Sequence, residues 1–230
     1  MKNALALEPH ANPCWFRLPP GFIDLDPLEL DSLRERVLED LSALHPEPDI
    51  REQQSHEALV LLGLLSDVYG QGTMHMSLGL HGSRDLEPST SVLSLSDVRT
   101  KAATRALAAA QCGLRLATDP FGTVVRREIV DLPCGTPATL VTSFLPELPA
   151  RLGSDAGIPF ESSGVFQARL AVARPTGPRV VLINLTTTTI DLSDEYTEIL
   201  LGVGRTLAFT DPAPPPDSPV GRSRLLDVLL

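Results

Sequence analysis

Apolar and polar residues alternate along residues 164–173, which is the pattern of a half-buried β-strand. The alternation places Phe166, Ala168, Leu170 and Val172 on one face and Gln167 and Arg169 on the other. Residues 174–178 contain prolines and a glycine and predict a turn, after which residues 179–189 run back as a second strand. A helix over residues 194–205 and a short strand over 206–209 complete the unit. The C-terminal third therefore predicts a β-hairpin that packs against a helix.

Two helices are predicted near the start of the chain, after a short strand at residues 14–18. Asp26 is a helix-capping residue, and the apolar positions that follow it repeat at helical spacing over residues 27–44. Asp49 caps a second helix over residues 50–69, which is apolar around most of its circumference in its second half. Such a helix is expected to be buried beneath another layer of the fold.

The middle of the chain predicts further strands around one helix. Residues 73–81 alternate as a half-buried strand, and a polar loop is expected over residues 82–91. Ser96 is expected to cap a helix that runs through Cys112, and the many alanines of this helix would allow it to approach a sheet closely. Three strand candidates follow, joined by turns that contain Pro and Gly: residues 114–118, 122–132 and 138–145.

These elements indicate an α+β fold in which an antiparallel sheet is flanked by helices, because short turns join the strands and the helices are grouped before and after them. We predict one domain over residues 14–210, a leader over 1–13, and a Pro-rich linker with an apolar tail over 211–230. No G-x-G-x-x-G motif follows a strand, which argues against a dinucleotide-binding fold. Gly202 and Gly204 are expected to permit close packing of the last helix on the sheet.

Two segments near the ends of the predicted domain carry a family resemblance. One is Phe-Arg-Leu-Pro-Pro-Gly-Phe at residues 16–22, and the other runs from Val180 through Tyr196 to residues 206–209. Both are similar to the Mog1/PsbP-type fold family, whose bacterial members include actinobacterial proteins related to the LpqN lipoproteins. The resemblance implies an α/β/α sandwich and a binding or accessory role with no shared catalytic motif. This chain differs from the lipoprotein members in lacking a lipobox and in carrying the two early helices.

Composition narrows the range of partners. The formal net charge of −10 would repel a polyanion, and aromatic residues at 4% provide few platforms for base stacking, so we expect no nucleic-acid partner. The three cysteines show no metal-ligand spacing, which favours a reducing compartment with thiols that act as small apolar groups. No apolar stretch reaches the ~20 residues that a membrane span needs. We therefore expect a cytoplasmic protein with no membrane partner and no cofactor.

Candidate chemistry is sparse. His75 and His81 would share the polar face of one strand, too far apart to hold one metal ion without a third ligand, and are expected at the surface. Cys134 lies in a turn that supplies no neighbouring base. No nucleophile elbow or H-E-x-x-H motif occurs. Three carboxylates are interpreted as the acidic first turn of a helix, with a metal cluster as the alternative: Asp191, Asp194 and Glu195.

These observations favour a non-enzymatic protein that binds another protein through a sheet face or through its C-terminal tail. The tail follows a Pro-rich spacer and is either displayed or folded back onto its own domain; its apolar residues are Leu225, Leu226, Val228, Leu229 and Leu230. The alternative is a binder of small molecules or anions, or an unrecognised enzyme, with its pocket between the helix over residues 50–69 and the sheet. Arg126, Arg127 and Arg169 would then anchor the anion.

Overall fold

A computed structural model describes residues 14–25, 72–83, 86–118, 122–145 and 164–210. The predicted leader, the predicted helices over residues 27–44 and 50–69, and the C-terminal tail lie outside the described residues.

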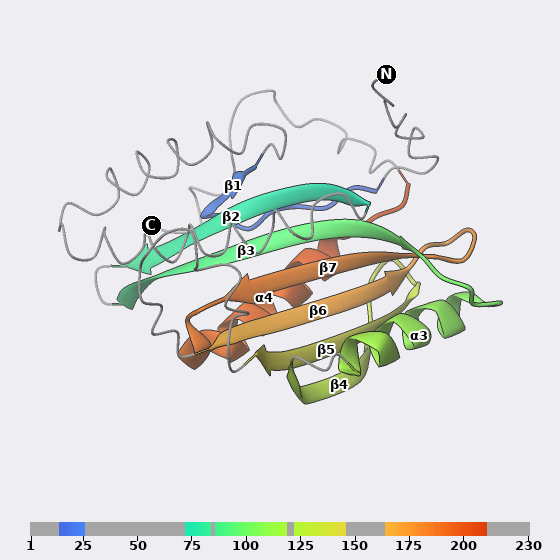
Figure 1. Cartoon of the computed structure of the whole chain (residues 1–230). Helices are drawn as coiled ribbons and strands as arrows, with labels where there is room; N and C mark the ends of the chain where they lie inside the picture. Colours follow the sequence, from blue (N-terminus) through green and yellow to red (C-terminus); the bar gives the residue numbers. More distant parts are fainter. Residues whose placement is uncertain (1–13, 26–71, 84–85, 119–121, 146–163, 211–230) are drawn as a thin grey trace, which may run out of the picture.

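The described strands form one antiparallel sheet with the order β1-β2-β3-β7-β6-β5-β4 (Figure 1). Two α-helices pack on this seven-stranded sheet, which confirms the predicted α+β class. The strands are β1 (Phe22–Asp24), β2 (Thr73–Ser83), β3 (Leu86–Arg99), β4 (Thr123–Asp131), β5 (Pro137–Leu145), β6 (Val165–Ala173) and β7 (Arg179–Thr187).

The hairpin β6–β7 lies near the middle of the sheet and matches the predicted hairpin. Leu170 pairs with Ile183, and the turn between the strands is closed by a hydrogen bond from the Arg174 amide to the Arg179 carbonyl at 2.9 Å. Gly177 has a φ of 72°, a conformation that glycine adopts without a steric penalty. Side chains on both faces of the hairpin are buried, so it forms the centre of the core.

Helix α4 (Ser193–Thr206) covers one face of the hairpin and confirms the predicted last helix. Its Tyr196 and Leu200 are buried in one cluster with Leu170 and Ile183. A Cβ atom at Gly204 would overlap Leu170, whereas a Cβ at Gly202 would meet no atom within 4 Å. Close packing on the sheet therefore requires a glycine at position 204 and not at 202.

Helix α3 (Arg105–Ala117) covers the opposite face, over β5 and β6. Thr104 caps its N-terminus by accepting a hydrogen bond from the Leu107 amide. A Cβ at Gly113 would overlap Cγ2 of Thr139 on β5 and would lie 3.0 Å from its Cβ, so this helix lies directly on the sheet. Figure 1 shows α3 and α4 on opposite sides of the sheet.

Strand β3 corrects the prediction for the segment before α3. Residues 82–91 were expected to form a loop and Ser96 to cap a helix, but β3 is a 14-residue strand that pairs with β2 and β7. The helix begins instead after Thr104, and residues 114–118, predicted as a strand, fall in its last turn and C-cap. Serine is a favoured helix cap, but two neighbouring strands satisfy the backbone of β3 along most of its length, and this pairing outweighs the local preference.

The ends of the domain also differ from the expected short strands. Residues 14–18 and 206–209 are joined by an isolated bridge between Trp15 and Ala208, whose two backbone hydrogen bonds measure 2.8 and 2.9 Å. The Arg17 amide also donates a hydrogen bond to Thr206 Oγ1 at 2.9 Å. Strand β1, which was not predicted, follows at Phe22–Asp24 and pairs with β2. The three residues of β1 lie between Pro20 and the predicted helix cap at Asp26, and a segment this short shows too little alternation to be recognised as a strand.

Replacing Gly113 with alanine should lower the free energy of unfolding by about 1–2 kcal/mol, because the added methyl overpacks against the stiff side chain of Thr139. Replacing Gly202 with alanine should raise it by about 0.5–1 kcal/mol, since the site is open and alanine is the better helix former. Urea unfolding of both variants measures the difference. Equal effects of the two substitutions would contradict the close approach of α3 to β5.

Candidate functional site

The three predicted anion anchors do not converge. Arg127 and Arg169 lie on the face that α3 covers, both level with Val141 on β5 and separated by two strand spacings of about 5 Å each. Arg126 faces the opposite side of the sheet, where it forms an ion pair with Glu128 at 2.8 Å. Because both partners are partly exposed, this pair contributes little to stability. The structure therefore does not bring these three guanidinium groups into one anion site.

Arg169 serves the contact between α3 and the sheet. Its side chain is buried, with 7% of the residue exposed, and its Nη2 donates to the Leu116 carbonyl at 3.2 Å and to Ser143 Oγ at 3.0 Å. Leu116 lies in the last turn of α3, where carbonyl groups lack intrahelical partners and the helix dipole favours a cation. Arg169 thus compensates the C-terminal end of a helix.

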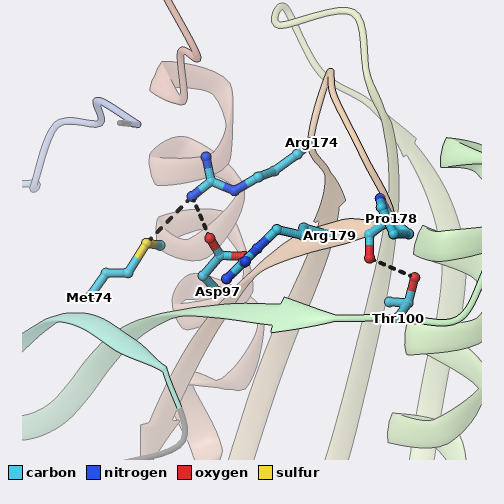
Figure 2. Close-up of polar contacts among 6 residues, drawn as sticks. All are labelled: Met74, Asp97, Thr100, Arg174, Pro178 and Arg179. Atoms are coloured by element: carbon cyan, nitrogen blue, oxygen red, sulfur yellow. Dashed lines mark hydrogen bonds and ion pairs between the residues drawn. The ribbon is translucent and has the colours of Figure 1, made fainter. Parts of the chain in front are cut away.

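A buried ion pair that was not predicted from the sequence lies beside the β6–β7 turn (Figure 2). Arg174 Nη2 lies 3.0 Å from Asp97 Oδ2, and the two side chains are 2% and 6% exposed. Arg179 Nε binds the other carboxylate oxygen at 2.9 Å. Arg174 also contacts Met74 Sδ at 3.6 Å and lies 5.7 Å from the centre of the Phe209 ring. This cluster joins β3 to the β6–β7 turn and to the segment after α4.

The cysteine thiols next to these charges are not activated as nucleophiles. Burial raises the pKa of Cys14, and the nearby Arg174 only partly opposes this effect. Burial likewise raises the pKa of Cys112 on α3, against a smaller opposing effect of Arg115 and Arg169. Cys134 Sγ lies 3.3 Å from Thr136 Oγ1 in its turn. A thiol with a raised pKa holds little thiolate at neutral pH, so Cys14 and Cys112 serve as packing groups.

His75 and His81 share one face of β2, as predicted, but that face is not the open surface that was expected. His75 packs edge-on against Phe16 at 4.9 Å between ring centres, and its Nε2 lies 3.6 Å from Asp24 Oδ1. Burial lowers the pKa of His75, and Asp24 partly opposes this effect. Burial also lowers the pKa of His81. On the α4 side of the sheet, Phe16 covers the His75 ring. Phe22 of β1 and Tyr196 of α4 cover the His81 ring.

His81 belongs to a small polar cluster between β2, β3 and α4. Its Nε2 lies 3.2 Å from Ser91 Oγ, and its ring packs edge-on against Tyr196, whose hydroxyl lies 2.7 Å from Ser89 Oγ. A Cβ at Gly79 would overlap both Ser91 and His81, so glycine makes room for the pair. A serine next to a histidine is the geometry of a nucleophile and its base. However, Ser91 is 0% exposed, so no substrate reaches its oxygen in this conformation and the pair is structural.

The predicted acidic cluster lies at the start of α4. Asp194 and Glu195 are exposed in its first turn and Asp191 precedes them, where the helix dipole favours negative charge. In the described part of the chain, no group of three or more His, Cys, Asp or Glu side chains is placed to hold a metal ion.

Large apolar side chains are exposed on α3 and on β4. Leu107 and Leu114 are 48% and 53% exposed on the side of α3 that faces away from the sheet. Val125 and Ile129 are 59% and 83% exposed on β4, the last strand on this side of the described sheet. We call Leu107, Leu114 and Ile129 the α3–β4 surface, because Ile129 lies on the face of the sheet that α3 covers and both elements lie at the same side of the described sheet (Figure 1). The sequence predicted binding through a sheet face or the C-terminal tail, but it did not single out α3, because residues 114–118 were expected to be a strand.

Comparisons with known proteins give no family for this chain: no family model and no curated protein matches it. Within the described residues, no helix is long and apolar enough to cross a membrane. The predicted tail residues and the predicted pocket beside residues 50–69 fall outside the described part of the chain.

Replacing Asp97 with alanine should lower the free energy of unfolding by about 3–5 kcal/mol, because it leaves the buried Arg174 guanidinium without its carboxylate. Replacing Arg179 with alanine removes a partner that is 44% exposed and should cost only about 0–1 kcal/mol. Denaturant unfolding of both variants gives the comparison. A cost for Asp97→Ala no larger than that for Arg179→Ala would rule out the buried pair as a main support of this region.

Stability should decrease as the pH falls below about 6.5. The pKa values of His75 and His81 lie below the ordinary value of 6.5 in the folded chain, so the unfolded chain binds more protons in this range. Their contribution is fully present above pH 6.5 and is lost as the pH falls. Thermal melting between pH 7.5 and 5.5 should show a shallower decline for the double variant His75→Gln, His81→Gln. Parallel curves for variant and wild type would exclude the histidines as the cause.

Proposed function

We propose that this chain is a non-enzymatic accessory protein that binds another protein through the α3–β4 surface. The observation that carries the proposal is the exposure of large apolar side chains on two adjoining elements at one end of the sheet. Large exposed apolar patches on a folded domain are typical of protein-binding sites. Association would remove Leu107, Leu114 and Ile129 from water.

The distribution of charged side chains supports this proposal over the binding of small molecules or anions. Arg169 is occupied by the end of α3, and Asp97 and Arg174 are occupied by each other. The Ser91–His81 pair is covered by protein. Each of these groups contacts a neighbouring part of the fold. Of the three predicted anion ligands, Arg126 and Arg127 remain, and they lie on opposite faces of β4, the last strand of the described sheet.

The fold we propose is an α/β/α sandwich of the Mog1/PsbP type. The position of α3 and α4 on opposite faces of one antiparallel sheet supports this assignment. The accessory role implied by that resemblance agrees with binding through a surface patch. A cytoplasmic location and a contribution of the apolar tail to binding remain parts of the same proposal.

Exchanging Leu107 and Leu114 together for aspartate should weaken binding to the partner about tenfold or more, because it places two charges in the buried centre of the contact. The partner is first isolated from native extract with the wild-type chain and its affinity is then measured with purified components. Ala106→Asp is the control, since it adds a charge at an exposed site of the same helix that lies outside the stripe of Leu107 and Leu114.

Equal binding by the double variant, or failure of the wild-type chain to retain a specific partner, would contradict the proposed surface. A chain truncated before Asp211 tests the tail separately. Binding that depends on the tail and not on α3 would move the site to the C-terminal leucines.

A further inference from the structure

Strand β4 presents a regular row of exposed side chains at the edge of the described sheet. After an irregularity between Val124 and Arg126, the pairing of β4 with β5 is continuous to Asp131. Arg127, Ile129 and Asp131 alternate along this part, lie on the same face as α3, and are all exposed. Ile129 is 83% exposed, more than any other large apolar residue among those described.

This row is complementary to itself under two-fold symmetry. An antiparallel contact between two copies of β4, centred on Ile129, places the two Ile129 side chains opposite each other. It also places Arg127 of each copy opposite Asp131 of the other, so both cross-strand pairs join opposite charges. A centre at Arg127 would set two arginines face to face, and a centre at Glu128 would set two glutamates face to face. The centre at Ile129 avoids both repulsions.

We propose that the partner at this edge is a second copy of the chain, joined through antiparallel pairing of the two β4 strands about Ile129. The inference rests on the proposed function: it concerns the β4 part of the α3–β4 surface and names a partner and a contact for that part. Backbone groups on the free side of an edge strand provide the hydrogen bonds of such a contact, and the alternating side chains determine its register. Arg126 and Glu128 keep their ion pair within one chain on the opposite face.

Sedimentation of the full chain over a range of concentrations tests the dimer. The wild-type chain should approach twice the mass of one chain, and Arg127→Asp or Asp131→Arg should each weaken the dimer at least tenfold, because like charges then face each other. An equimolar mixture of the two single variants should restore association, since aspartate at 127 faces arginine at 131 and aspartate at 131 faces arginine at 127. The chain with both substitutions should dimerise by itself for the same reason.

Arg126→Asp is the matched control and should leave the dimer within about threefold of wild type, because its side chain lies on the other face. Hydrogen exchange of the wild-type chain gives a measurement without substitutions: amides of residues 126–131 should become more protected as concentration rises. A wild-type chain that stays monomeric, a mixture that does not associate, or a stronger effect of Arg126→Asp than of Arg127→Asp would overturn the inference.

The two proposals fail separately. If the wild-type chain does not self-associate, the dimer is wrong. If the double variant at Leu107 and Leu114 then loses a different protein partner, the proposed surface still stands. A dimer that forms in the register above, with no other protein bound at α3, would limit the α3–β4 surface to self-association.

Discussion

The burial of hairpin β6–β7 on both faces is the constraint on which the structure depends. Helix α4 covers one face and helix α3 the other, so almost every side chain of the two strands must fit against a neighbour. Both helices approach the sheet through a glycine: Gly204 of α4 lies against Leu170 of the hairpin, and Gly113 of α3 lies against Thr139 of the neighbouring strand β5. Protein interiors are densely packed, and one added methyl group at such a contact forces a backbone or side-chain shift. The central layer is therefore filled by packed side chains on both faces of the hairpin.

Charged side chains stabilise the places where this packed centre ends. Arg169 meets the last turn of α3, and Arg174 meets Asp97 beside the β6–β7 turn. A charge withdrawn from water needs a partner of opposite charge or several hydrogen bonds, and each of these groups has one or both. Arg169, which was predicted as an anion ligand, therefore stabilises the end of α3 instead. The exposed apolar side chains of α3 and β4 lie outside this packed centre.

The edge of the sheet contrasts with its middle. On β6 the face toward α3 is buried, whereas on β4 the same face exposes Arg127, Ile129 and Asp131. An exposed edge strand is a natural place for association because its free backbone groups already have the geometry of a sheet. Among the described elements, β4 and the outer side of α3 expose large apolar side chains that do not contribute to the core.

The sequence by itself determined the elements whose pattern is local: strand β2, the β6–β7 hairpin with its inward and outward residues, and helix α4. It failed at β3, where Ser96 looks like a helix cap and the strand is decided by pairing with the preceding strand β2 and with β7, which is remote in sequence. Only the tertiary structure decided that Asp97 meets Arg174, that Arg169 caps α3 and that His81 lies beside Ser91. Periodicity records which face of an element is apolar, but the partner of a polar side chain depends on which distant strands become neighbours.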